Sequence, residues 1–202
     1  MHKSQLLEFD DFIPPFATAT DDVILKGVNY ASGAAGICDE TGYQVRLYNL
    51  GARKVALIGV GVLGCIPYAI SIYGTNGSAC VDGFNNAAQI FNGKLVALVD
   101  ELNTRYSAVA KFIYVNSFEI VGSGYPTSTV FTVLNVGCCP VTSAGQCSPL
   151  STPCQNRTTY VFWDSNHPTE TANVFTAFRS YNSSLPFDTY PMNIKRLVEL
   201  QL

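Results

Sequence analysis

The sequence has 202 residues, enough for one domain with a buried core, and we expect a single domain over residues 1–202. Hydrophobic residues make up 48% and charged residues only 13%, about half the usual share, which excludes a disordered chain. A formal net charge of −3 provides no positive field, so we expect no nucleic-acid partner.

Apolar segments are short. The longest, residues 55–62, is interrupted by Gly59 and Gly61 and is far shorter than the ~20 residues of a membrane helix, so we expect no transmembrane segment. After Met1 the chain leads into leucines and then acidic side chains, without the apolar core of a signal peptide, and we expect none here.

The predicted elements alternate between strands and helices. Residues 53–60 form a short, branched apolar run that favours a buried strand, and residues 111–115 form another. Between them, residues 83–106 predict a helix of about six turns. Its apolar side chains recur at helical spacing: Phe84, Ala87, Ala88, Phe91, Leu95, Leu98, Val99 and Leu102.

The last third of the chain begins with a loop over residues 136–159 that is rich in cysteine and proline. Pro168 then predicts the first position of a helix that runs to about Ser180, with Glu170 in its first turn. The strand–helix–strand–helix order predicts an α/β domain with a parallel sheet.

Seven cysteines and three glycosylation sequons indicate a secreted glycoprotein. Four cysteines lie within residues 138–154, and none of the seven stands in the CxxC pairs of a zinc site, so we expect no metal. An adjacent cysteine pair inside a loop favours two disulfides that fix this loop. The sequons begin at Asn76, Asn156 and Asn182.

Residues 160–170 contain the side chains best suited to catalysis. Asp164 and His167 stand three residues apart before the predicted helix, so one loop can project both into one cleft. In a serine hydrolase the carboxylate orients the imidazole, which accepts the serine proton. Because the only other histidine is His2, His167 is the candidate general base. From these residues alone, the pattern is also typical of helix capping or of a surface polar pair.

Several segments resemble blocks of the plant GDSL (SGNH) esterases/lipases. Residues 162–170, Phe-Trp-Asp-Ser-Asn-His-Pro-Thr-Glu, resemble the last block of this family. Residues 27–36, Gly-Val-Asn-Tyr-Ala-Ser-Gly-Ala-Ala-Gly, resemble its second block. The resemblance extends over nearly all of residues 6–202 and includes residues 47–55, 64–67, 138–139 and 153–157.

The resemblance implies a role for each matching residue. His167 corresponds to the general base, Asp164 to the carboxylate that orients it, and Gly33, rather than Gly36, to a backbone donor of the oxyanion hole. The implied activity is hydrolysis of small-molecule or lipid esters through an acyl-enzyme, without a cofactor, by a secreted protein.

Two blocks of the family have no match. The Gly-Asp-Ser block, which carries the nucleophile, would precede this chain, and the Gly-Asn-Asp block would lie between residues 42 and 47. No serine stands in Gly-Asp-Ser or Gly-x-Ser-x-Gly context, and we interpret Ser32, Ser123 and Ser165 as loop residues. We therefore expect a truncated and inactive ester hydrolase. The alternative is a non-catalytic secreted glycoprotein or pseudoenzyme that only binds.

The resemblance implies a flavodoxin-like three-layer sandwich with strand order 2-1-3-4-5, here incomplete because strand 1 and the region of strand 3 are missing. Strand 2 would lie near residues 28–31, strand 4 at 53–60 and strand 5 at 111–115. Strand 2 then lacks both neighbours. Since unpaired buried backbone groups cost ~1–3 kcal/mol each, strand 2 either moves beside strand 4 or the domain is poorly stable.

Six of the cysteines are expected to form disulfides. The four cysteines of the 136–159 loop should pair among themselves, which leaves Cys38 over. The expected pairs are Cys138–Cys147, Cys139–Cys154 and Cys65–Cys80.

Overall fold

The computed structural model describes residues 51–202 apart from Asn76, Gly124 and residues 126–128, together with Leu6, Pro14 and residues 18–20. The chain forms two compact units, Met1–Arg53 and Lys54–Leu202, and the elements below belong to the second. The strand expected near residues 28–31 lies outside the described residues. A single domain over the whole chain stays a prediction.

A three-stranded sheet occupies the centre of the second unit. β1 (Lys54–Ile58) and β2 (Lys111–Val115) pair in parallel, as the two apolar runs predict. β5 (Thr189–Tyr190) pairs with the end of β2 in the antiparallel direction, so the sheet, in the order β1-β2-β5, is mixed and not wholly parallel. A strand of two residues leaves no periodic pattern, which is why the sequence did not reveal this edge.

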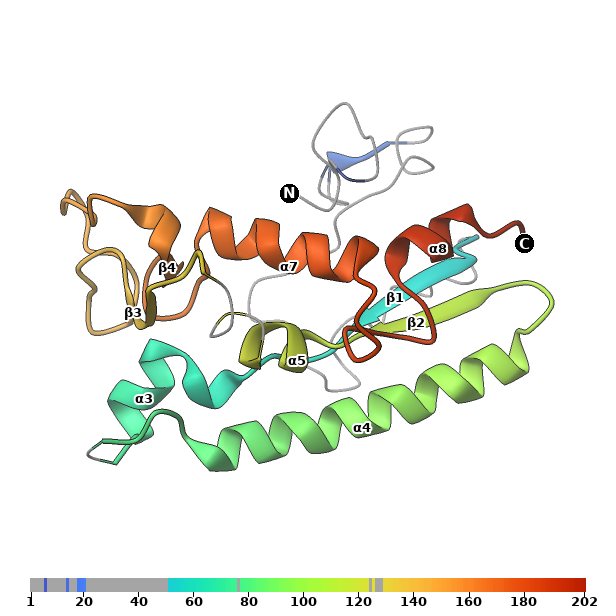
Figure 1. Cartoon of the computed structure of the whole chain (residues 1–202), viewed down its shortest axis with the longest axis horizontal. Coiled ribbons are helices and arrows are strands. Elements are labelled where there is room, and N and C mark those ends of the chain that lie inside the picture. The colour runs from blue at the N-terminus through green and yellow to red at the C-terminus, as the bar shows by residue number, and fades with distance from the viewer. Residues whose placement is uncertain are drawn as a thin grey trace. The chain divides into compact units, whose positions relative to one another are not determined.

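Helices lie on both sides of this sheet (Figure 1). α4 (Asp82–Arg105) runs along one side and packs against β2. α8 (Ile194–Glu199) packs against β1 and β2 from the other side, and α7 (Glu170–Asn182) continues that layer. The arrangement is the expected α/β fold with the sheet between two helical layers.

The long helix α4 begins and ends within one residue of its predicted bounds. Its buried positions include Ala88 and Val99, which the apolar pattern identified, and also Asn92, which it did not. Asn92 Nδ2 donates to Val60 O and Asn92 Oδ1 accepts from Val60 N, both at 2.8 Å. A buried amide on the helix therefore fixes the backbone directly after β1.

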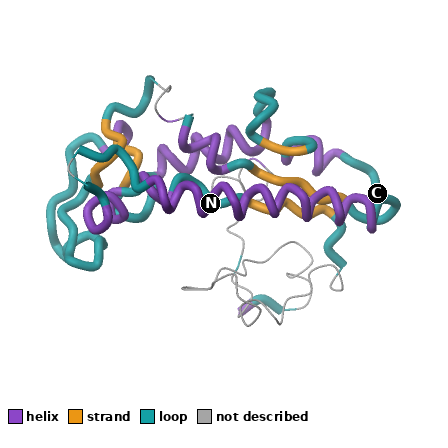
Figure 2. Tube along the Cα trace, turned by 90° about the horizontal axis from the view of Figure 1, so that it is seen from below, coloured by secondary structure: helices purple, strands orange, loops and turns teal. Residues whose placement is uncertain are grey.

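A second sheet of two strands forms at the two ends of the predicted loop. β3 (Val133–Gly137) and β4 (Tyr160–Phe162) pair in parallel. Figure 2 shows these short strands set apart from the central sheet. The predicted loop is therefore wrong at residues 136–137, which belong to β3. The sequence of β3, Val-Leu-Asn-Val-Gly, does not alternate between apolar and polar residues, and β4 has only three residues, so neither shows a period-two pattern.

In the part of the second unit that the structure describes, four short helices with defined bounds join these strands and helices. The 3₁₀ helix η2 (Leu63–Cys65) and α3 (Pro67–Tyr73) follow β1, α5 (Ser117–Gly122) follows β2, and the 3₁₀ helix η3 (Arg157–Thr159) precedes β4. An apolar cluster packs between α5, β4 and α7. Its buried members are Tyr125, Phe131, Val161, Phe162 and Ala172.

The helix α7 begins at Glu170, two residues after the proline that was predicted to open it. Thr169 is the N-cap: its Oγ1 accepts from Ala172 N at 3.2 Å and donates to Tyr160 O at 2.7 Å. Pro168 instead forms a β-bridge with Phe162. The prediction of Pro168 as the first helical residue was wrong, because a threonine side chain caps the helix after it.

Three disulfides lie within the second unit. The pairs are Cys65–Cys80, Cys138–Cys154 and Cys139–Cys147. The first pair is as expected, whereas the pairing expected inside the 136–159 loop was wrong. Thr142 N donates to Gln146 O at 2.8 Å, and this turn returns the chain so that Cys147, not Cys154, lies beside Cys139. Cys38 lies outside the described residues.

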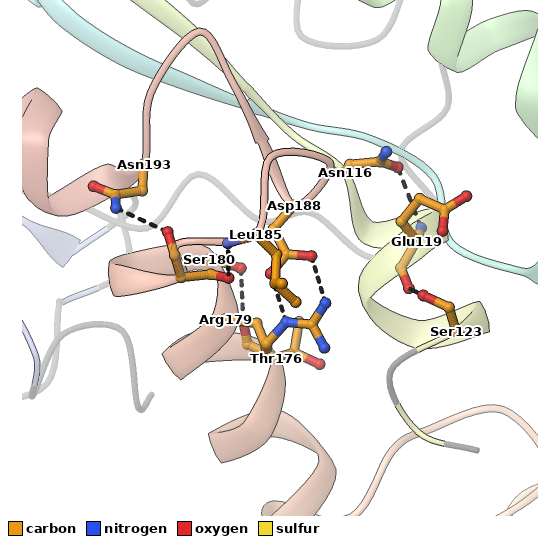
Figure 3. A network of polar contacts seen from close by, with 10 residues as sticks. Asn116, Glu119, Ser123, Thr176, Arg179, Ser180, Leu185, Asp188 and Asn193 are labelled. Atoms are coloured by element: carbon orange, nitrogen blue, oxygen red, sulfur yellow. Dashed lines mark hydrogen bonds and ion pairs between the residues drawn. The ribbon is translucent and has the colours of Figure 1, made fainter. Parts of the chain in front are cut away.

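A buried ion pair fixes the C-terminal segment to α7 (Figure 3). Arg179 Nε and Nη2 donate to the two carboxylate oxygens of Asp188, each at 2.5 Å. Hydrogen bonding to Asp188 raises the pKa of Arg179 above its ordinary value. Asn116 N, directly after β2, donates to Asp188 O at 2.8 Å. One fully buried residue therefore connects α7, the approach to β5 and the end of β2.

Candidate active site

Asp164 and His167 lie in the turn that leads from β4 to α7. His167 Nδ1 lies 2.8 Å from Asp164 Oδ2. The other carboxylate oxygen, Oδ1, accepts from the backbone N–H groups of Asn166 and His167, both at 2.7 Å. Because an ionised carboxylate only accepts hydrogen bonds, the imidazole donates its Nδ1 proton to Asp164. The short spacing of the two residues therefore forms one closed turn that also orients the ring.

Burial differs sharply between the two side chains. That of Asp164 is 7% exposed, whereas that of His167 is 67% exposed. Burial raises the pKa of Asp164, but the backbone N–H of His167, the backbone N–H of Asn166 and the His167 ring lower it further, so that the pKa lies below its ordinary value. A buried, charged carboxylate therefore holds the imidazole ring through its Nδ1 atom, while most of the ring is exposed to solvent.

The second ring nitrogen of His167 is the one that a general base would use. Among the residues that the structure describes, no hydrogen bond to Nε2 is recorded and no serine hydroxyl contacts the ring. Ser165, the nearest serine in sequence, contributes its backbone to the turn instead: its N–H donates to Gly145 O and its O accepts from Tyr68 N. The backbone of Ser165 thus stabilises the turn through these two hydrogen bonds.

The turn is placed at the carboxyl ends of the parallel pair β3 and β4. A Cβ atom at Gly137, the last residue of β3, would lie 2.8 Å from Asp164 O, so only glycine permits this close approach. Trp163 N donates to His167 O at 2.8 Å and closes the turn from the other side. Open α/β sheets place their ligands outside the carboxyl ends of the strands, and this pair lies at such an edge.

Two apolar cavities border this edge. One has a volume of about 470 Å³ and the other about 210 Å³. The smaller one reaches Pro168, the residue after His167, and the larger one reaches the Cys65–Cys80 disulfide. Both are lined by Val62, Val121, Tyr125, Val161 and Phe162, so they adjoin each other. The lining of the smaller cavity therefore includes the residue that follows His167 in sequence, but neither side chain of the Asp164–His167 pair.

The remaining predicted sites are only partly described. Gly33 and Gly36 lie outside the described residues, as does Asn76. Asn156 and Asn182 are exposed, as glycosylation requires. Across the described positions, no group of histidine, cysteine and acidic side chains could hold a metal ion. No helix in that part of the chain has the length and apolar character of a membrane span.

Comparison with known families identifies the family of the chain. The family model described as GDSL-like lipase/acylhydrolase matches residues 28–178, which include the Asp164–His167 turn and most of the fold. The chain belongs to this family. The α/β arrangement of strands and helices described above is consistent with an incomplete fold of this family.

Relatives of the GDSL family in Arabidopsis thaliana match most of the chain. GDSL esterase/lipase At1g29670 is 36% identical over 284 residues, with 98% of this chain and 78% of that protein covered. GDSL esterase/lipase At1g29660 is 32% identical over 286 residues, with the same coverage. GDSL esterase/lipase 7 is 41% identical over 161 residues, with 77% of this chain and 44% of that protein covered.

The lengths of these alignments show that the chain lacks internal GDSL sequence. The alignment with At1g29670 extends over 284 residues, although the chain has only 202. The relative therefore contains residues inside the aligned range that have no counterpart here. The GDSL sandwich is accordingly incomplete in this chain.

Proposed function

We propose that the chain carries the acid–base part of a GDSL-type carboxylic ester hydrolase. His167 Nε2 acts as the general base, and Asp164 holds the ring in the tautomer that leaves Nε2 free. The observation that supports this proposal is the 2.8 Å contact between His167 Nδ1 and a buried carboxylate whose pKa is lowered. The alternative is a pair that only caps the helix or lies on the surface. Such a pair would not need a buried, ionised carboxylate in contact with an exposed imidazole ring.

The proposed reaction has two stages. In the first, the base accepts the proton of a serine hydroxyl as its oxygen attacks the ester carbonyl, and passes this proton to the departing alcohol. In the second, the base accepts a proton from water as the water oxygen attacks the acyl carbonyl, and it gives this proton to the serine oxygen as the acyl–serine bond breaks, which releases the carboxylic acid and the serine. The scheme requires no cofactor.

The apolar cavities suggest the class of ester. Their shared lining is aliphatic and aromatic, and the lining of the smaller cavity includes Pro168, which follows the proposed base in sequence. An apolar acyl chain bound in these cavities would lose water-exposed surface, which is worth roughly 0.8 kcal/mol for each buried CH₂. We therefore propose carboxylic esters with an apolar acyl group as substrates.

The 202 residues by themselves should turn over little ester. None of their serines has the sequence context of a nucleophile, and the aligned relatives contain sequence that is missing here. Hydrolysis of p-nitrophenyl butyrate by this chain should stay near the rate of buffer, and His167→Ala should not change it. A fluorophosphonate probe should label no serine. Turnover that His167→Ala abolishes would contradict inactivity and would still support His167 as the base.

A chimeric chain tests the base itself. We would insert the Gly-Asp-Ser and Gly-Asn-Asp blocks of the family so that the nucleophile is restored. This chimera should hydrolyse p-nitrophenyl butyrate, and His167→Ala or Asp164→Asn should each lower kcat by a factor on the order of 10⁴. Asn156→Ala is the control, because Asn156 is an exposed residue that caps the 3₁₀ helix η3. Unchanged kcat in both site variants would refute the proposed roles.

A secreted, glycosylated protein without catalysis is the second candidate. It is favoured by the exposed Asn156 and Asn182 and by three disulfides, which persist in oxidising compartments. Asn156 Oδ1 accepts from Thr158 Oγ1 at 2.6 Å, so the amide nitrogen of this sequon points away from that contact. Expression in a eukaryotic secretory host followed by glycosidase treatment should lower the mass. No change in mass would exclude glycosylation.

A further inference from the structure

Gly145 lies at the tip of the disulfide-closed loop and contacts the catalytic turn. Its backbone has φ +76° and it is buried. Gly145 O accepts from Ser165 N at 2.9 Å. A Cβ atom at this position would lie 2.9 Å from Asn166 Nδ2, 2.9 Å from Tyr68 Cδ2 and 3.1 Å from Ser165 Cβ. The glycine therefore fits against the two residues that separate Asp164 from His167.

The loop that presents Gly145 is held in place by its own bonds. The Cys139–Cys147 disulfide closes it, and Gly145 N donates to Thr142 O at 2.9 Å. At its base, Cys139 N donates to Trp163 O at 3.0 Å, one residue before Asp164. The loop thus contacts the catalytic turn at two points, on either side of the carboxylate.

We propose that Gly145 is a positioning residue for the Asp164–His167 pair. The N–H groups of Asn166 and His167 hold Asp164 Oδ1, so the path of the backbone through residues 165–166 determines where the carboxylate lies under the ring. A side chain at position 145 would displace this path and separate the imidazole from Asp164 Oδ2. This inference rests on the proposed role of the pair, but it concerns the geometry of the pair and not ester turnover.

The test compares two glycines with similar backbone angles. Gly145→Asn adds a side chain where three atoms lie within 3.1 Å, whereas Gly77→Asn, at φ +85°, meets nothing within 4 Å. Asparagine tolerates positive φ better than most residues, so backbone strain is small and similar in both variants. The contrast therefore isolates the contact with the turn.

The readout is the tautomer of His167, measured by ¹⁵N NMR of the imidazole in alkaline buffer. Only His2 and His167 contribute, and a His2→Ala chain assigns the signals. The unmodified chain and Gly77→Asn should show His167 protonated at Nδ1, as its contact with Asp164 requires. Gly145→Asn should lose most of this signal while its circular dichroism stays unchanged. These results do not depend on esterase activity, so failure of the proposed function leaves them interpretable.

Three outcomes would overturn the proposal. The first is a folded Gly145→Asn chain that retains the Nδ1-protonated form, and the second is an equal loss in Gly77→Asn. If Gly145→Asn does not fold, amide exchange in the unmodified chain decides. The Ser165 N–H donates a hydrogen bond to Gly145 O, so its hydrogen should exchange with solvent at least about 100-fold more slowly than that of an exposed amide. Exchange at the rate of an exposed amide would be the third contrary outcome.

Discussion

At the scale of single residues, Asp164 shows how a buried carboxylate can stay charged. Desolvation alone would favour its protonated form, since burial penalises charge. Two backbone N–H groups and one imidazole nitrogen, all within 2.8 Å, offset this penalty. The same contacts that keep the charge also hold the ring of His167. Electrostatics and orientation are thus supplied by one short turn.

The Asp164→Asn variant should lose less stability in acid than the unmodified chain. Because the folded pKa of Asp164 lies below its ordinary value of 3.8, the charged group stabilises the fold above about pH 4, and this contribution is lost as the pH falls through the folded pKa. Urea unfolding at about pH 6 and about pH 2.5 measures the difference. The unmodified chain should lose more free energy of unfolding between these values than Asp164→Asn.

Glu101→Gln, at an exposed position of α4, is the control for this pH experiment. It should lose as much stability in acid as the unmodified chain. If Asp164→Asn also does so, the charge of Asp164 does not contribute to the folded state in the way described.

At this scale the sequence predicted that Asp164 and His167 meet in one loop, but not which residues support that loop. Asp164 and His167 could be identified because carboxylate and imidazole at this spacing can share one loop. Asn92 and Gly145 could not, since a buried amide on a helix and a glycine in a loop look ordinary until their contacts across the fold are known. Long-range contacts, not local patterns, give such residues their roles.

At the scale of elements, α4 and α7 differ in how well the sequence locates their ends. The apolar spacing of α4 extends over many turns, so its bounds were predicted within one residue. The start of α7 depends on one hydroxyl, that of Thr169, and Pro168 misled the prediction. β3 and β4 were missed because their stabilisation comes from pairing with each other.

Thr169→Ala should destabilise the junction of β4 and α7. The hydroxyl of this buried residue caps α7 and also donates to Tyr160 O, so its removal takes away both hydrogen bonds at once. We expect a loss of about 1–2 kcal/mol in the free energy of unfolding, measured with urea. Thr104→Ala is the control, because Thr104 Oγ1 only donates within α4 at an exposed site. Equal losses in the two variants would contradict a capping role.

The Arg179–Asp188 pair should be among the costliest side-chain contacts to break. Asp188 is fully buried, so Arg179→Met leaves an unpaired charge inside the protein and should cost about 3–5 kcal/mol. Thermal or urea unfolding measures this loss. Lys195→Ala breaks an exposed pair with Glu199 and should cost about 1 kcal/mol or less. A small loss in Arg179→Met would show that the C-terminal segment is held by other contacts.

At the scale of the molecule, the second unit contains the sheet, the three disulfides and the Asp164–His167 turn. The class of fold followed from the order of apolar runs, and β1 beside β2 followed from the family resemblance. The edge strand β5 did not, because its place is set by Asp188 and Asn116, which are far apart in sequence. Gly33, which the family resemblance implies as an oxyanion donor, lies in the first unit, outside the described residues.

The second unit should survive as a folded fragment. Its boundary falls at Arg53 and Lys54, and compact units separate where few contacts cross. Brief digestion with trypsin should leave a core that begins near residue 54 and keeps its circular dichroism. Mass spectrometry identifies its ends. Uniform degradation without such a core would show that the two units do not fold separately.

The closeness of Asp164 and His167 in sequence has a consequence for the order of folding. A contact across three residues closes a very small loop, and loops of this size close in well under a microsecond. The parallel pairing of β1 with β2 must instead close a loop of more than fifty residues and forms far more slowly. The carboxylate and the imidazole can therefore meet in the nascent chain before any sheet exists, and the folded domain inherits a pair that was assembled first.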